Sequence, residues 1–139
     1  MARIHTTRNL NARNYIFTNQ HRARQNANKS LWTITEDEEF NSFSLMCNQN
    51  WILDQYKGWS LHRVGSINDF LGVNPKNERV QIAKFVDSSK NSLWHGYPVN
   101  YRESVHDKPH NEVLQKWVDD KKITKVQMSK ISRGKDLEI

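Results

Sequence analysis

The chain has almost no cysteine, and its single thiol, Cys47, has no second cysteine with which to pair. An internal disulfide is therefore excluded, and packing alone must hold the fold together. No apolar run approaches the roughly 18 residues of a membrane span, and the apolar run at residues 15–17 is far shorter than the core of a signal peptide. These absences favour a soluble protein of a reducing compartment, and we expect it in the cytoplasm and not at a membrane.

Glycine-rich phosphate loops, CxxC pairs, internal repeats and low-complexity tracts are also absent. The usual nucleoside-triphosphatase, dinucleotide-fold and zinc-finger interpretations are excluded with them. His106 and His110 have HxxxH spacing, but Pro109 favours a helix that begins near it, so the two rings would not share a helix face. We therefore expect neither a metal nor another cofactor.

Acidic residues are missing from the N-terminal stretch. Residues 1–30 contain no Asp or Glu, whereas the formal charges of residues 31–139 cancel, so the whole net charge of +6 lies in this stretch. Its many Asn residues hydrogen-bond to the local backbone and compete with a helix, so it has little folding drive of its own. We expect a basic arm over residues 1–30 and a single domain over residues 31–139. The cations of the arm are Arg3, Arg8, Arg13, Arg22, Arg24 and Lys29.

A capping box marks the first expected helix. Thr35 and Glu38 have the spacing at which each side chain bonds the backbone N–H of the other. Phe40, Phe43 and Cys47 follow at helical spacing and would press one apolar stripe on the core. The pattern predicts a helix over residues 36–48.

Two more helices are expected near the C-terminus. Apolar residues recur at helical spacing from Val113 to Trp117, in a segment that Pro109 can begin. Thr124 and Gln127 form a second capping box, which predicts a last helix that ends at Gly134. The lysines around this last helix allow a groove-binding interpretation, although helical pairs more often close a core.

Strand patterns fill the middle of the chain. Residues 51–53 and 59–64 flank Gly58 and predict a β-hairpin, and residues 80–86 and 92–97 predict two further strands. Residues 66–69 indicate a single helical turn. The predicted fold is α+β: a small antiparallel sheet of three to five strands, packed with an N-terminal helix and a C-terminal helical hairpin and preceded by the basic arm.

One stretch has the residue types of a catalytic site. His95 lies beside Gly96, which lets a ligand approach the backbone closely. Together with His62 as the second acid or base and either Arg63 or Arg102 to stabilise the transition state, it would suffice for metal-independent RNA cleavage. The alternative is a structural, hydrogen-bonded His95, since six His in the chain make such a set easy to find by chance.

Three functions remain open at this point. The first is a nucleic-acid-binding domain, for RNA ahead of DNA, in which the arginines of the arm bind phosphates. The second is a protein-binding module, such as an inhibitor or immunity-type partner, whose arm meets an acidic protein. The third is a small metal-independent ribonuclease or toxin-like enzyme.

Overall fold

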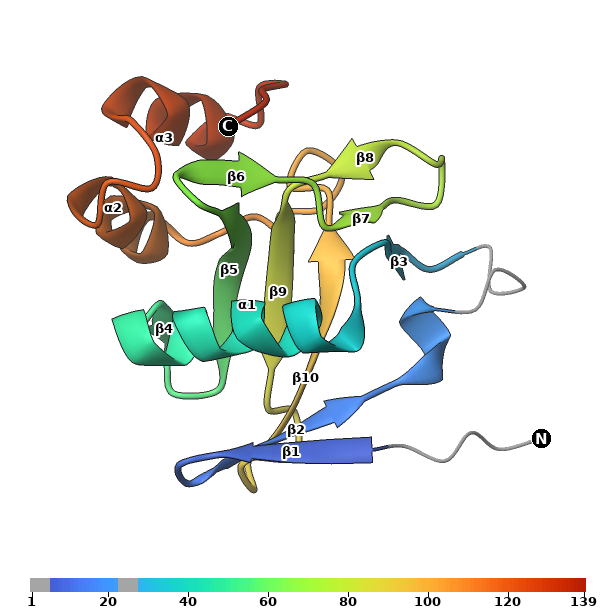
Figure 1. Cartoon of the computed structure of the whole chain (residues 1–139). Helices are drawn as coiled ribbons and strands as arrows, with labels where there is room; N and C mark the ends of the chain where they lie inside the picture. The colour runs from blue at the N-terminus through green and yellow to red at the C-terminus, as the bar shows by residue number, and fades with distance from the viewer. Residues whose placement is uncertain (1–5, 23–27) are drawn as a thin grey trace.

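The computed structural model describes residues 6–22 and 28–139 (Figure 1). Within them the chain forms a seven-stranded sheet, a separate three-stranded sheet and three α-helices. Strands β1 (Thr6–Leu10) and β2 (Arg13–Phe17) make an antiparallel hairpin, and a 3-10 turn, η1 (Asn19–His21), follows it. The N-terminal stretch is therefore folded where the structure describes it.

The hairpin joins the main sheet through a parallel pairing. Residues Leu93 and Trp94 of β10 (Leu93–Val99) stand opposite Asn14 and Tyr15 of β2. The order of the sheet is β1-β2-β10-β9-β5-β4, and β6 pairs with the last three residues of β5. The remaining members are β9 (Ile82–Val86), β5 (Lys57–Val64), β4 (Ile52–Leu53) and β6 (Ile67–Asp69).

The expectation of a small antiparallel sheet of three to five strands preceded by an arm is wrong. The sheet has seven strands because the hairpin of residues 6–17 adds two, and a second sheet forms from β3 (Leu31–Trp32), β7 (Gly72–Val73) and β8 (Arg79–Val80). Tyr15 and Phe17 are buried in the core, and this burial drives a stretch that has little local propensity to fold into the sheet.

Two local expectations in the strand region also need correction. Residues 66–69 form no helical turn, because β6 lies there and pairs with the end of β5. The turn of the β4–β5 hairpin is at Asp54 and Gln55, which both have positive φ, and not at Gly58. Gly58 lies inside β5 instead, where an added Cβ would come within 2.5 Å of the Met46 sulfur.

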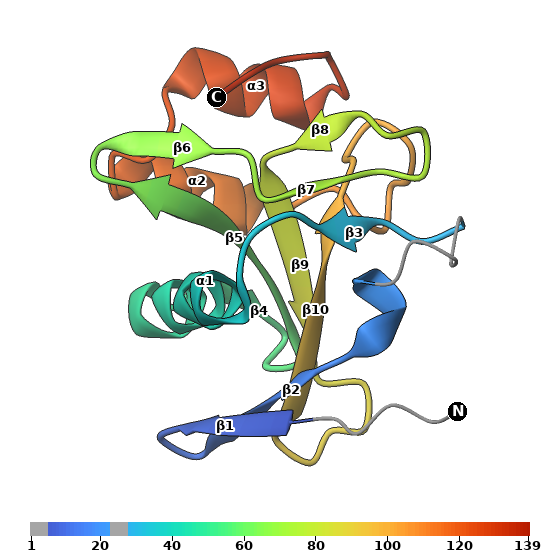
Figure 2. The same cartoon turned by 45° about the vertical axis from the view of Figure 1, so that its right-hand side comes forward.

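The three helices are where the sequence predicts them. α1 (Glu36–Gln49) and α3 (Lys125–Ser132) begin at the expected capping boxes, while α2 (Asn111–Asp119) has His110 as its N-cap. α1 lies across one face of the main sheet, and α2 and α3 pack together beside the end of β5 (Figure 2). Among the described residues, no helix combines the length and the hydrophobicity that are needed to span a bilayer.

The sheet has two faces with different roles. Alternate positions of β5, namely Gly58, Ser60 and His62, face α1. On this face the Ser60 hydroxyl donates a hydrogen bond to the Ser42 carbonyl. The opposite face carries Trp59, whose indole N–H donates to the Asp107 carbonyl at 3.0 Å in the connection between β10 and α2. This second face is the one that bears a polar cleft.

Candidate functional site

Arg22 of the predicted arm belongs to a buried network. Its guanidinium lies 2.6 Å from a carboxylate oxygen of Glu39, which is only 2% exposed, and also donates to the Ile34 carbonyl at 2.8 Å. The Tyr15 hydroxyl donates to the other carboxylate oxygen. Burial raises the pKa of Glu39, while the hydrogen bonds from Tyr15 and Arg22 lower it. Arg22 is thus part of the interior and not a free phosphate ligand.

Two other arginines of this stretch also have partners within the fold. Arg8 forms an ion pair with Asp37, and its guanidinium lies 5.4 Å and 5.3 Å from the ring centres of Phe17 and Phe40. Arg13 lies 5.9 Å from the ring of Trp94. Arg8 and Arg22 therefore neutralise acids in the first turn of α1, and this explains part of the charge asymmetry structurally. Lys29 is exposed, and Arg3 and Arg24 lie outside the described residues.

The structure does not bring His62, His95 and Arg102 together. His62 faces α1, where its ring nitrogen lies 3.4 Å from Glu38. His95 projects from the opposite face of the sheet, and its row of the sheet lies five residues along β5 from His62, about 16 Å at the usual rise. Arg102 lies 3.9 Å from Asp136, beside a separate cavity of about 280 Å³. An acid and base pair made of His62 and His95 is therefore not formed.

Gly96 has a structural explanation. A Cβ at this position would lie 2.3 Å from the ring of Phe85, because Gly96 faces the α1 side of the sheet and not the side of His95. The close approach that the sequence indicates is made by a core ring and not by a ligand.

A cleft of about 510 Å³ does open beside His95. Its floor is β10, where His95 and Tyr97 project from the same face, two residues apart. His21 from η1 closes one side and stacks on Tyr97, with ring centres 5.2 Å apart and planes within 17°. Asp107 bounds the other side, and its carboxylate accepts a hydrogen bond from the Tyr97 hydroxyl at 3.1 Å.

The two histidines of the cleft are neutral near pH 7. Burial lowers the pKa of His21 and of His95 from the ordinary value, which already lies below 7. Nδ1 of His21 lies 2.9 Å from the Ser30 carbonyl, so this nitrogen carries the proton and Nε2 presents a lone pair. Within the described part of the chain, the ring of His95 makes no hydrogen bond. The cleft therefore presents acceptor atoms on two aromatic rings.

Asp107 is held firmly in place. Its N–H donates to the Ser104 carbonyl at 3.2 Å and its own carbonyl accepts from Trp59, while one carboxylate oxygen accepts from Tyr97. Burial raises the pKa of Tyr97 above its usual value, and Asp107 raises it further, so the phenol stays protonated and donates. The second carboxylate oxygen of Asp107 has no hydrogen bond to a described residue, and Asp107 lines the cleft.

Sequence reasoning identified His95 in this cleft but missed His21 and Asp107. His21 follows an Asn-rich stretch that has no motif, and it reaches Tyr97 only through the pairing of β2 with β10. Asp107 lies between the two histidines with HxxxH spacing and belongs to no motif of its own. No local signal could have placed either residue beside His95.

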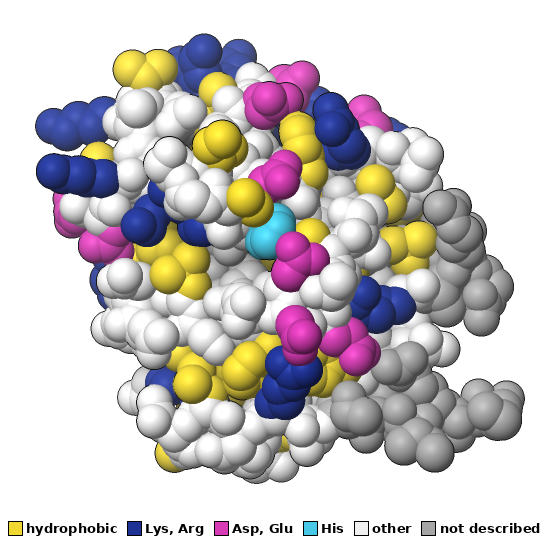
Figure 3. All heavy atoms as spheres, in the orientation of Figure 1, with side chains coloured by type: hydrophobic (Ala, Val, Ile, Leu, Met, Phe, Trp, Pro, Cys, Tyr) yellow, Lys and Arg dark blue, Asp and Glu magenta, His cyan; other side chains and the backbone are white. Residues whose placement is uncertain are grey.

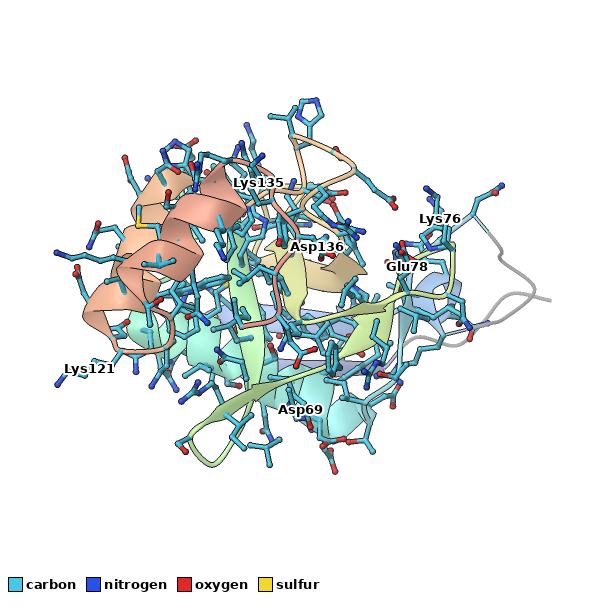
Figure 4. The ribbon with its side chains drawn as sticks, turned by 90° about the horizontal axis from the view of Figure 1, so that it is seen from above. Asp69, Lys76, Glu78, Lys121, Lys135 and Asp136 are labelled. Carbon is cyan, nitrogen blue, oxygen red and sulfur yellow. The ribbon has the colours of Figure 1, made fainter. Side chains whose placement is uncertain are left out.

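A second polar surface lies on the outer side of α2 and α3. Residues 108–135 contain eight basic and three acidic side chains, a net charge of +5. Dark blue side chains project along the upper left of this view, where the two helices lie (Figure 3). Lys121 projects away from the body at the turn between the helices, and Lys135 lies at the other end of α3 (Figure 4). The lysines without an ion pair to any described residue include Lys121, Lys122, Lys125, Lys130 and Lys135.

The charges at the start of α3 differ from those at the start of α1. The first turn of α1 contains four acidic residues, which suit the positive end of a helix dipole. The first turn of α3 contains no acid, and Lys121, Lys122 and Lys125 surround it. Cations at this end of a helix destabilise it slightly, so packing within the protein does not account for the three lysines.

Comparison with protein-family models, with curated proteins and with solved structures finds no match to this chain. Two surfaces remain from which to infer a function: the cleft beside β10 and the basic face of the helical pair.

Proposed function

We propose that the protein binds nucleic acid through the basic face of the helical pair, which comprises the exposed lysines of residues 121–135. One observation carries this proposal: a net charge of +5 over residues 108–135, with lysines that form no ion pair within the described part of the chain. Phosphates are the natural partners of such lysines, since each contact releases condensed counterions.

The apolar side of the helical pair leaves this face free for a partner. Leu114, Trp117 and Ile131 are fully buried and fix the two helices against the sheet. Trp117 also meets Trp51 edge to face, with ring centres 5.8 Å apart. The lysine side chains therefore stand on a rigid platform, which favours positioned phosphate contacts over loose attraction.

The N-terminal cations contribute less to this proposal than the sequence indicates. Arg22 is used in the buried network, and Arg8 and Arg13 lie against aromatic rings. A contact to phosphate by Arg3, Arg24 or Lys29 stays a prediction.

The test is a titration of fluorescent single-stranded RNA and of duplex DNA at several salt concentrations. Five lysine contacts should give a log–log slope against salt of about −3 to −4 on a single strand, at about −0.7 for each phosphate. In the triple variant Lys121→Gln, Lys122→Gln, Lys125→Gln, the magnitude of this slope should fall by about 2, again at about 0.7 for each phosphate contact that is removed.

The matched control removes the same charge at positions outside the helical pair. The triple variant Lys57→Gln, Lys76→Gln, Lys90→Gln should keep the wild-type slope. Equal losses in the two triple variants would show only general attraction to a cationic protein. No binding of RNA or DNA at low salt would refute the proposal and favour a protein-binding module.

A further inference from the structure

The cleft beside β10 is rich in hydrogen-bond acceptors. Nε2 of His21 and the second carboxylate oxygen of Asp107 both lack hydrogen bonds to described residues. The local charge is nearly balanced, because Glu103 and Asp107 line the cleft together with exposed Lys29, and Lys84 lies close to Asp107. A neutral ligand with N–H donors fits such a site better than a free cation or anion does.

The cleft has aromatic side chains against which a planar ligand can pack. His95 and Tyr97 are half-buried and lie side by side on one face of β10, about 7 Å apart along the strand. A volume of about 510 Å³ is within the usual range for small-molecule sites. The rim carries amide and hydroxyl groups that can bond the polar edges of a ring, among them those of Asn28, Ser30, Asn100 and Ser104.

We propose that this cleft binds one unpaired, amine-bearing base of a single-stranded nucleic acid, with its exocyclic N–H donating to Asp107 and its ring against Tyr97 or His95. Cytosine, adenine and guanine carry such an amine, whereas uracil does not. Stacking on aromatic side chains and hydrogen bonds to the base edge are the common mode of single-strand recognition. This inference rests on the proposed function and adds base selectivity to it.

The cleft and the basic face of the helical pair are joined by one segment. The segment of residues 100–108 contributes Asn100, Glu103, Ser104 and Asp107 to the lining of the cleft. The same segment contacts the end of α3, where Lys108 donates to the Ser132 carbonyl at 3.0 Å and Tyr101 to the Lys135 carbonyl at 2.5 Å. A single strand that lies along the lysines near the end of α3 can therefore place a neighbouring base in the cleft.

The test compares two labelled RNA oligomers of ten nucleotides, all cytidine and all uridine, at one salt concentration. Their phosphates are identical, so the basic face of the helical pair contributes equally to both. We expect the cytidine oligomer to bind about tenfold more tightly, as a hydrogen bond to a charged acceptor implies.

Asp107→Asn is the decisive variant. The asparagine oxygen can still accept from Tyr97, while its NH₂ replaces the open acceptor with a donor. The preference for cytidine should therefore disappear or reverse towards uridine, whose O4 is an acceptor. Asp54→Asn removes the same charge at an exposed turn and should keep the preference. Equal binding of both oligomers by the wild type would overturn the inference.

A second measurement uses only the wild-type protein, so it still tests the cleft if Asp107→Asn fails to fold. It also tests base binding in the cleft separately from nucleic-acid binding by the helical pair. Titration of the wild-type protein with CMP, followed by the imidazole NMR signals of His21 and His95, should shift both signals, whereas UMP at the same concentration should not. Absence of a shift with CMP would overturn the assignment of the cleft. If neither oligomer binds at low salt, the proposed function fails, and the CMP titration decides the cleft alone.

Discussion

Replacement of Arg22 by Met tests whether the N-terminal stretch is part of the fold. Glu39 is 2% exposed and the Arg22 side chain 19%, so the pair is largely removed from water. Loss of one partner leaves a buried, uncompensated charge, which costs about 3 to 5 kcal/mol. A domain with a total stability of about 5 to 15 kcal/mol would then approach unfolding.

The loss should depend on pH. Burial raises the pKa of Glu39 in the folded state above the unfolded value, so the folded state holds this proton up to a higher pH. The contribution of Glu39 to the free energy of unfolding is therefore fully present below the pKa that Glu39 has in the unfolded state. It is lost as the pH rises through the pKa that Glu39 has in the folded state. Removal of Arg22 raises the folded-state pKa of Glu39 further above the unfolded value. Arg22→Met should therefore lower the free energy of unfolding more at pH 8 than at pH 5.

Urea unfolding at the two pH values measures both effects. Arg8→Met is the matched control, because it breaks an ion pair at the surface, where the usual contribution is about 0 to 1 kcal/mol. A loss below about 1 kcal/mol for Arg22→Met, within this surface range, would refute the assignment of the stretch to the core. A loss that grew towards acid pH would refute the argument about Glu39.

Two further substitutions test the packing. Trp117→Ala should lower the free energy of urea unfolding by about 3 to 5 kcal/mol, since its ring is fully buried, whereas Val126→Ala on an exposed helix surface should change it by less than about 0.5 kcal/mol. Gly96→Ala should lower the melting temperature through an overpacking cost of about 1 to 3 kcal/mol, because the new methyl group meets the Phe85 ring. Gly65→Asn, at a left-handed position with open space, should leave it nearly unchanged, and a similar loss in both would contradict this account.

The helices could be predicted because their signals are local. The capping boxes at Thr35 and Thr124 each involve residues three positions apart, and both are present in the structure. The apolar spacing that leads to Trp117 likewise needs only one turn of context. Such patterns predict a helix without any knowledge of the residues against which the helix packs.

The sheet could not be predicted in full because its pairings are distant. β2 has an apolar run of only three residues, and its pairing with β10 depends on Tyr15 entering a core of Phe43, Phe85 and other rings. Deletion of residues 1–30 would therefore remove two strands and two buried rings, and we expect it to destabilise the domain. The cleft could not be predicted for the same reason, because the pairing of β2 with β10 also places His21 beside Tyr97.

The parallel pairing of β2 with β10 has a consequence for synthesis on the ribosome. Tyr15 and Trp94 are about 80 residues apart in the chain, so at about 5 to 20 residues per second the hairpin waits roughly 4 to 16 seconds for its partner strand. Until β10 emerges, Tyr15 and Phe17 have no complete core to enter, and the surrounding cations keep the nascent segment hydrated and mutually repelling. The same arginines that later close against α1 thus also protect the growing chain from premature association.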